Sequence, residues 1–355
     1  MIKLHLLFEH DAGGNPHGCS HIRLLRPFAH PSVAGVLVVT HGTALPDSPV
    51  DVVVVERSWK PDFSLAGVEQ LVNTVRSQGA RLIYTLDDNL LDLHEDAPWE
   101  PYPTSEQRVA MRHLAREADE VIVSTVALAQ RLSRLNKNVS VVPNALDEQL
   151  FPAPGSVPAS AGGKCKIGYM GTRTHAADLL MILVPLRDFL RRHKTEVELE
   201  LVGVFADARV AKCFDDYPVR VLDVGDAVDY ARFIPWATRH LQWDFALAPL
   251  HDNAFNNSKS DIKFLDYAML GIPAIFSAVT AYTDSVVHRE TGWLCANHTE
   301  AWSAALEGMF ADTALRTAMA HQAQAHAWAH RTLKQCAVQW LEVVNRVASR
   351  RTFLS

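Results

Sequence analysis

The feature that most constrains the fold is a series of short, unbroken apolar runs separated by amphipathic helical patterns. The runs are rich in Val and Ile and do not alternate with polar residues, as strands buried on both faces of a parallel sheet do. In the first part of the chain we expect strands at 3–9, 35–40, 50–56, 81–86, 120–124 and 139–142, with helices at 20–28, 64–77, 105–118 and 126–135.

A proline- and glycine-rich segment at 151–164 (FPAPGSVPASAGGK) interrupts this alternation and is typical of a linker. Strands are expected again at 166–170, 197–202, 219–224, 244–250 and 274–277, with helices between them and helices only after residue 300. The pattern predicts an α/β chain of two doubly wound, Rossmann-like halves. We expect domains at 1–155 and 156–330, and a terminal helix in 331–355 that packs toward the first domain.

Composition narrows the class of protein. The 355 residues (39.4 kDa) are 48% hydrophobic, enough for two cores, and the net charge of −6 argues against a nucleic-acid partner. The five cysteines are scattered without a CxxC pair, which favours a reducing compartment and neither disulfides nor zinc. Neither a signal peptide nor a membrane-spanning run is recognisable, so a cytoplasmic protein is expected, with peripheral membrane contact left open.

Ligands of doubly wound sheets bind at the carboxyl ends of the strands. A glycine-containing loop, GGNPHG, follows the first expected strand, and its spacing differs from GxGxxG, so a simple turn and a ligand loop both remain open. The residues that this rule selects in the first half are Gly13, Gly14, Glu56, Arg57, Asp87 and Asp88.

Adjacent acids follow one expected strand, RLIYTL. Asp87 and Asp88 could hold a metal, orient an acceptor hydroxyl or act as a base. The alternative is that Asp88 only caps the following turn. A metal site is not expected, because the sequence offers no further acidic or histidine partner nearby.

In the second half, a turn of Gly171, Thr172 and Arg173 follows the first expected strand. Arginine at this position could clamp a phosphate with two hydrogen bonds, while glycine permits close approach of the ligand. The alternative is an ordinary surface arginine.

The stretch SKSDIKFLDYAMLGIP predicts a helix capped by Ser258 or Ser260. Lys259, Lys263 and Asp266 share one face of that helix. Two lysines near a helix N-terminus suit a pyrophosphate, and an acid one turn deeper suits a sugar hydroxyl. A solvated amphipathic face is the alternative.

Four segments together resemble the GT-B glycosyltransferases of the retaining glycosyltransferase family 4. They are ADEVIVST with VSVVPNALDEQLF, then KIGYMGTRTHAADL, then WDFALAPL with SKSDIKFLDYAMLGIPAI, and DSVVHRETGWL. The resemblance implies two Rossmann-like domains facing a central cleft. It also implies transfer of a hexosyl or deoxyhexosyl group, with retention, from a nucleotide-diphosphate sugar to a hydroxyl of a glycan or lipid-linked glycan. The process would be bacterial surface polysaccharide assembly, such as O-antigen.

The resemblance also assigns residues. Lys263 and Arg173 would hold the diphosphate, Asp266 would bind the ribose, and Ser258 replaces the first acid of the family's Glu-x7-Glu motif. The donor set is Gly14, Gly171, Thr172, Arg173, Ser258, Lys259, Lys263 and Asp266; the acceptor side is Gly13, Asp87 and Asp88; and the catalytic set is Arg173, Lys263 and Asp88. No metal and no bound cofactor is expected. A nucleotide-sugar epimerase or hydrolase, or a non-catalytic donor-binding subunit, stays as an alternative.

Overall fold

The computed structural model of the chain describes residues 1–92, 103–155, 163–172, 175–203 and 212–350. The chain forms two compact units. The first comprises Met1–Asp147, Ser258–Ser260 and Thr332–Ser355, and the second comprises Glu148–Asn257 and Asp261–Arg331.

The first unit contains a parallel sheet in the order β2-β1-β3-β4-β5-β6. Its central strand β3 (Val52–Glu56) is buried at every residue, because helices cover both faces of the sheet. The other strands are β1 (Ile2–Leu7), β2 (Leu37–Gly42), β4 (Arg81–Leu86), β5 (Glu120–Val123) and β6 (Val139–Val141).

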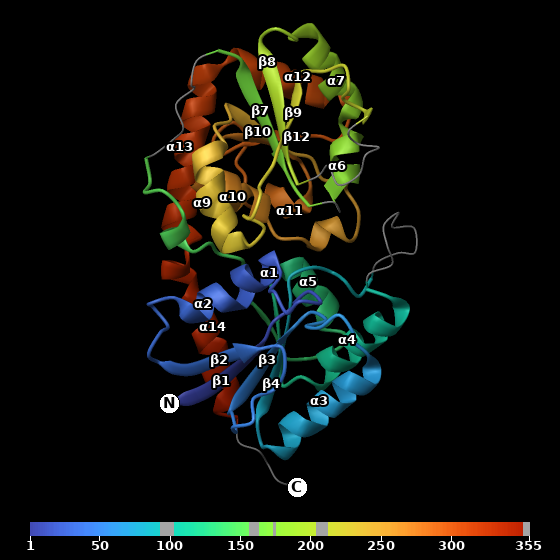
Figure 1. Ribbon diagram of the computed structural model, residues 1–355, viewed down its shortest axis with the longest axis vertical. Coiled ribbons are helices and arrows are strands. Elements are labelled where there is room, and N and C mark those ends of the chain that lie inside the picture. The colour runs from blue at the N-terminus through green and yellow to red at the C-terminus, as the bar shows by residue number, and fades with distance from the viewer. Residues whose placement is uncertain (93–102, 156–162, 173–174, 204–211, 351–355) are drawn as a thin grey trace. The chain divides into compact units, whose positions relative to one another are not determined.

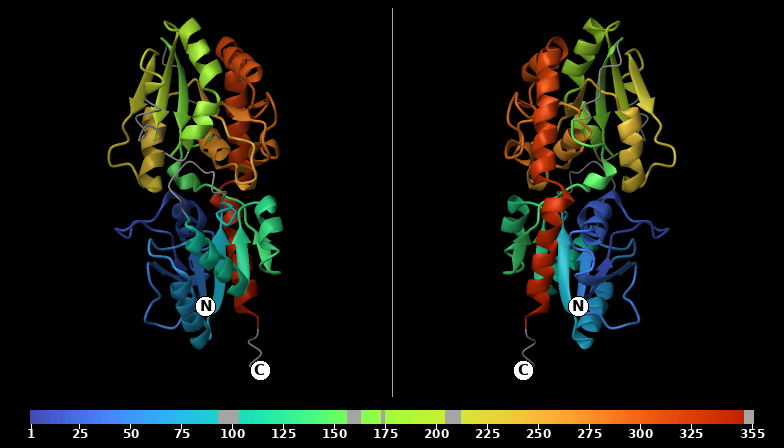
Figure 2. Two further views of the ribbon diagram at one scale, coloured as in Figure 1. Left: turned by 90° about the vertical axis from the view of Figure 1, so that its right-hand side faces the viewer. Right: turned by 90° about the vertical axis from the view of Figure 1, so that its left-hand side faces the viewer.

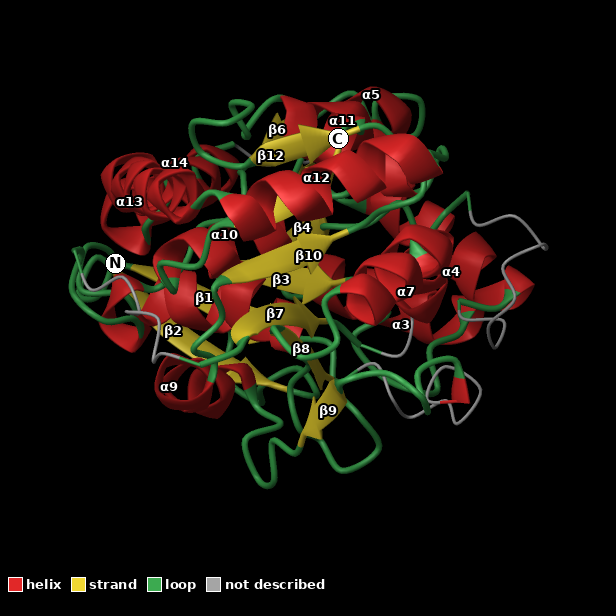
Figure 3. Cartoon of the chain, turned by 90° about the horizontal axis from the view of Figure 1, so that it is seen from above, coloured by secondary structure: helices red, strands yellow, loops and turns green. Residues whose placement is uncertain are grey.

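Helices flank this sheet on both sides (Figures 1 and 3). On one side lie α3 (Leu65–Ser77) and α4 (Ser105–Glu117), and on the other lie α2 (Arg26–Ala29) and α14 (Leu333–Ala348). Side-chain caps begin both α3 and α4: Ser64 caps α3, and Thr104 with Gln107 forms a capping box on α4. The remaining elements are α1 (Gly18–Ser20), the π-helical turn η1 (His21–Leu25), α5 (Val126–Leu132) and η2 (Glu148–Leu150), which opens the second unit.

The C-terminal helix α14 belongs to the core of the first unit. Its apolar face, including Trp340 and Val344, packs against strand residues such as Leu4 and Val52. Phe28 meets Trp340 edge to face at 5.6 Å. Figure 2 shows α14, in red, running beside the first unit's strands.

The second unit repeats the architecture with the strand order β12-β11-β10-β7-β8-β9, again parallel. Helices α10 and α13 lie on one side of its strands and α7 on the other (Figures 1 and 3). The strands are β7 (Cys165–Met170), β8 (Val197–Val202), β9 (Val219–Leu222), β10 (Phe245–Ala248), β11 (Ala274–Ser277) and β12 (Trp293–Cys295). The helices are α6 (Ala176–Met181), α7 (Leu183–Arg192), α9 (Tyr230–His240), η5 (Asn256–Ser258, which ends in the first unit's segment), α10 (Ile262–Met269), α11 (Thr280–Thr283), α12 (Thr299–Ala311) and α13 (Thr313–His330).

The expected α/β architecture with two doubly wound halves is confirmed, and three local expectations need correction. The helix expected at 20–28 divides into α1, η1 and α2, and the helix expected between the strands at 166–170 and 197–202 divides at Ile182 into α6 and α7. The third correction concerns α10, which begins at Ile262, so neither Ser258 nor Ser260 caps it. Asp261 takes the cap position without a side-chain cap bond, because its carboxylate binds Arg331 at 2.7 and 2.8 Å and Ser285 at 2.6 Å.

Across the described residues, no helix combines the length and the apolar character that crossing a membrane requires.

Candidate functional site

An arginine-centred cluster occupies the carboxyl ends of β1, β3 and β4 in the first unit. Arg57, directly after β3, donates from Nε to Asp87 Oδ1 at 2.5 Å and from Nη2 to Asp88 Oδ2 at 2.9 Å. Its Nη1 lies 3.3 Å from Glu9 Oε2. The three side chains of Arg57, Asp87 and Asp88 are 14%, 12% and 25% exposed, so Asp88 is the most accessible of them. Of the residues that the strand-end rule selected in this unit, Arg57, Asp87 and Asp88 thus lie in contact.

The backbone at Arg57 is unusual. Its φ angle is +44°, in the left-handed region that residues with a Cβ seldom adopt. Two hydrogen bonds hold it there: Arg57 N donates to Thr85 O at 3.0 Å, and the Tyr84 hydroxyl donates to Arg57 O at 3.0 Å. Residues held in such sparsely populated backbone regions cluster at functional sites, which makes Arg57 a candidate.

The two adjacent acids have different electrostatic environments. Burial raises the pKa of Asp87, but the charge and hydrogen bond of Arg57 outweigh it, and the net pKa is lowered. For Asp88, burial and the charge of Asp87 outweigh the opposing effects of Arg57 and Lys259, and its pKa is raised. Asp87 is thus fixed as an anion, while Asp88 is the more basic and more accessible carboxylate.

Glu9 and Glu56 complete the cluster beneath these acids. Glu9 Oε1 accepts from Ser58 at 2.9 Å, and Glu56 Oε2 accepts from the Glu9 amide at 2.9 Å and contacts Ser20 Oγ at 2.5 Å. Burial, followed by the charges of Glu9 and Asp87, raises the pKa of Glu56 to about 7. Glu56 Oε1 is buried and, like both polar atoms of the buried Asn89, has no hydrogen-bond partner within the part of the chain that the structure describes.

The glycine loop is a turn organised by Asp11. The Asp11 side chain accepts hydrogen bonds from the amides of Gly13 at 2.8 Å and Asn15 at 2.9 Å, and the Gly14 amide donates to Asp11 O at 3.0 Å. Gly14 has a φ of +79°, which explains the glycine. The amides that a ligand loop would offer are therefore engaged within the turn, and the ligand roles of Gly13 and Gly14 stay predictions.

In the second unit, Lys263 lies at the carboxyl end of the sheet. The first turn of α10 carries it, its side chain is buried, and Nζ lies 3.4 Å from the Tyr169 hydroxyl and 4.6 Å from the centre of the Tyr169 ring. A Cβ on Gly171 would lie 3.5 Å from the same Nζ. The ammonium group and the glycine turn after β7 therefore meet, as the sequence pattern predicts for two strand-end elements.

Asp266 lies one turn further along α10. Its Oδ1 accepts from the Tyr230 hydroxyl of α9 at 3.0 Å. Burial raises the pKa of Asp266 to about 7, although the Tyr230 bond and the charge of Lys263 oppose this. The solvated-face alternative does not hold for Lys263, which is buried.

Ser258 and Lys259 belong to the first unit, whereas Lys263 and Asp266 belong to the second. Ser258 is 1% exposed, and its carbonyl accepts from Thr125 Oγ1 at 2.9 Å. The charge of Lys259 acts on Asp88. In the turn after β7, the carbonyl of Thr172 accepts from the His175 amide at 3.0 Å, and Arg173 lies outside the described residues.

Sequence reasoning missed three members of these clusters. Glu9 was expected inside the first strand, but β1 ends at Leu7 and leaves Glu9 past the strand end. Tyr169 and Tyr230 carry no sequence signal of their own, because only the packing of β7 and α9 beside α10 brings their hydroxyls to Lys263 and Asp266.

No protein-family profile matches the chain, and no curated protein matches it. Solved structures do match over nearly the whole length. Sucrose-phosphate synthase from Thermosynechococcus elongatus is 14% identical with a TM-score of 0.71, covering 98% of this chain and 99% of its own. HepE from Anabaena in complex with UDP and glucose is 14% identical with a TM-score of 0.67 (98% and 100% covered). A glycosyltransferase from Rickettsia africae is 11% identical with a TM-score of 0.64 (99% of both chains).

At this identity the matches establish the fold. Two doubly wound parallel sheets in one chain, matched end to end by glycosyltransferase structures, define the GT-B fold. The chain has this fold.

Proposed function

We propose that this chain is a glycosyltransferase that moves a sugar from a nucleotide-diphosphate sugar to a hydroxyl of a glycan acceptor. The observation that carries the proposal is the arrangement of Lys263 beside Gly171, with Asp266 one turn away, at the carboxyl end of a doubly wound sheet. Solved chains of the same fold include HepE bound to UDP-glucose.

In this proposal the second unit binds the donor. The ammonium group of Lys263 neutralises the diphosphate and stabilises it as the leaving group, and Gly171 leaves room for the phosphates to approach. Ionised Asp266 accepts a hydrogen bond from a ribose hydroxyl. Arg173, which follows Gly171 in the sequence, is proposed as the second diphosphate ligand.

The first unit binds the acceptor. Asp88 orients the acceptor hydroxyl and takes its proton, while Arg57, which Asp87 anchors, holds the Asp88 carboxylate in place.

The finer features of the reaction rest on the family resemblance. We propose transfer of a hexosyl or deoxyhexosyl group with retention and without a metal, to a glycan or lipid-linked glycan of a bacterial surface polysaccharide such as O-antigen. The protein would work in the cytoplasm, with peripheral contact to the inner face of the cytoplasmic membrane.

The test is Lys263→Ala. Turnover of nucleotide sugars should fall by about 10²- to 10³-fold, the usual effect of removing one group that stabilises the developing charge. Lys164→Ala, which removes an exposed lysine elsewhere in the second unit, is the matched control and should be fully active. Circular dichroism and thermal unfolding must show that Lys263→Ala is folded, since Lys263 is buried. Full activity of a folded Lys263→Ala protein would overturn the assignment.

A second candidate is a non-catalytic subunit that binds the donor. It is favoured by Ser258, which stands where the family has its first acid and is buried in the first unit. Calorimetric binding of nucleotide sugars without turnover, over a panel of acceptors, would support it. Conversion of the donor without any acceptor would instead indicate an epimerase or hydrolase.

A further inference from the structure

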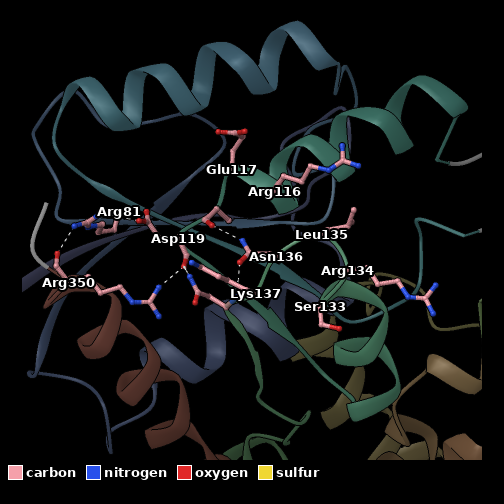
Figure 4. A pocket seen from close by; sticks show the side chains of 12 residues that line it. Arg81, Arg116, Glu117, Asp119, Ser133, Arg134, Leu135, Asn136, Lys137 and Arg350 are labelled. Carbon is pink, nitrogen blue, oxygen red and sulfur yellow. Dashed lines mark hydrogen bonds and ion pairs between the residues drawn. The ribbon is translucent and has the colours of Figure 1, made fainter. Parts of the chain in front are cut away.

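The first unit contains a polar pocket at the amino ends of its strands. The pocket has a volume of about 650 Å³ and is formed by the starts of β4 and β5, the C-terminal end of α4 and the loop 133–138 (Figure 4). Asp87 and Asp88 lie past the opposite end of β4, which at about 3.3 Å per residue places them roughly 20 Å away along the strand. The pocket is therefore separate from the arginine-centred cluster.

Both acidic residues that line the pocket are already neutralised. Asp119 accepts from Arg81 at 3.0 Å and from the Leu82 amide at 2.8 Å. Glu117 pairs with Arg76 at 2.6 Å. The lining residue Arg350 donates to Glu120 at 2.5 Å. These groups contribute little net charge to the pocket.

Three further cations in the lining have no such partner. Arg116, Arg134 and Lys137 are exposed, and no ion pair or side-chain hydrogen bond joins them to another residue within the described ranges. Figure 4 shows Arg116 and Arg134 extending to the same side of the pocket, away from Arg81 and Arg350. The pocket thus carries a surplus of about three positive charges in a chain whose net charge is −6.

The negative C-terminal ends of two helices offset only part of this positive surplus. The C-termini of α4 and α5 lie at the pocket, and each is equivalent to about half a negative charge. Together they offset roughly one of the three cations. A concave surface lined by the remaining charge of one sign concentrates counter-ions.

We propose that this pocket binds a phosphorylated ligand that carries at least two negative charges, held by Arg116, Arg134 and Lys137. Its volume lies in the range of small-molecule sites. Guanidinium groups bind phosphate oxygens in pairs, and a lysine adds a point charge. The phosphate could belong to a free metabolite or to a lipid headgroup, and the chemistry of recognition is the same for both.

The experiment measures hydrogen exchange of the full-length protein with and without inorganic pyrophosphate at low salt. We expect slower exchange in residues 116–138, and loss of the effect at high salt, where the Debye length falls to about 3 Å. This local readout is independent of pyrophosphate bound near Lys263, so the result does not depend on the proposed function.

Charge reversal of the pocket tests the assignment of residues. The triple variant Arg116→Glu, Arg134→Glu, Lys137→Glu should bind pyrophosphate in this pocket at least about tenfold more weakly. A triple glutamine variant gives the same test if the reversal prevents folding. The control is the triple variant Lys164→Glu, Lys194→Glu, Arg232→Glu, which changes the net charge equally but at exposed residues of the second unit. In this variant, pyrophosphate should protect residues 116–138 as it does in the wild type.

Vesicles distinguish the two sources of phosphate. Protection of 116–138 by phosphatidylglycerol vesicles, with none from phosphatidylcholine vesicles or free pyrophosphate, identifies a lipid headgroup. Protection by pyrophosphate alone identifies a soluble ligand. The absence of protection by either probe, or equal weakening in the control variant, overturns the proposal.

Discussion

The guanidinium Nε of Arg57 lies 2.5 Å from Oδ1 of Asp87, joining the carboxyl ends of two neighbouring strands. The same side chain reaches Asp88 and Glu9, so one cation contacts three acids in a largely buried site. Removing one partner of a buried ion pair is costly, because it leaves the other charge buried and uncompensated.

Arg57→Ala should therefore lower the free energy of unfolding by about 3–5 kcal/mol, measured by urea denaturation at neutral pH. The control is Arg191→Ala, which breaks an exposed pair with Asp188 and should cost no more than about 1 kcal/mol. Equal losses in the two variants would mean that Arg57 does not hold the cluster together.

Glu56 makes stability depend on pH in a predictable direction. Its pKa is about 7 in the folded protein and 4.5 in its ordinary state, so the folded chain binds the extra proton between these values. The contribution of Glu56 to the free energy of unfolding is fully present below about pH 4.5. It is lost as the pH rises through about 7, which lowers the free energy of unfolding by up to roughly 3 kcal/mol.

Glu56→Gln cannot ionise and should remove that fall. Denaturation at pH 5 and pH 8 should show the variant gaining stability relative to the wild type at pH 8. If the free energies of unfolding of the variant and the wild type differ by the same amount at pH 5 and at pH 8, Glu56 does not hold the extra proton in the folded protein.

Asp266 should make nucleotide binding depend on pH in the opposite sense. The ionised carboxylate accepts a hydroxyl hydrogen bond and the protonated form does so poorly, so with a pKa of about 7 the affinity for UDP should rise up to about tenfold from pH 6 to pH 8. Calorimetry at pH 6 and pH 8 measures the affinity for UDP. Asp266→Asn is the control, because the phosphate of UDP titrates equally with both proteins, and the two pH dependences should differ. Identical dependences would remove Asp266 from the site.

Asp88→Asn should lower kcat by about 10²- to 10⁴-fold and leave the donor KM nearly unchanged, since a general base acts on the acceptor and not on the donor. The matched variant is Asp62→Asn, in which the acid removed is 81% exposed. Wild-type turnover in folded Asp88→Asn would leave Asp88 with only a structural role.

The periodicity of the sequence determined the architecture. Continuous apolar runs such as that of β3 require cover on both faces, and that requirement alone predicts a parallel sheet with helices on both sides. The strand-end rule also selected Arg57, Asp87 and Asp88, because parallel strands deliver their carboxyl ends to one edge.

Local signals failed where tertiary contacts compete for the same groups. The sequence predicted a helix capped by Ser258 or Ser260, but the helix begins at Ile262. Asp261 takes the cap position, and its carboxylate binds Arg331, seventy positions along the chain. For the glycine loop the sequence left a turn and a ligand loop open, and the tertiary structure shows a turn in which the Asp11 side chain accepts from the amides of Gly13 and Asn15.

The sequence by itself thus determined which strands form and which edge of each sheet carries polar side chains, since both follow from local periodicity. Only the tertiary structure decided the charge state and partners of those side chains. The packing of α9 brings Tyr230 to Asp266, the fold of β7 puts Tyr169 beneath Lys263, and burial raises the pKa of Glu56. Desolvation and hydrogen bonding depend on residues distant in the chain, which no local pattern specifies.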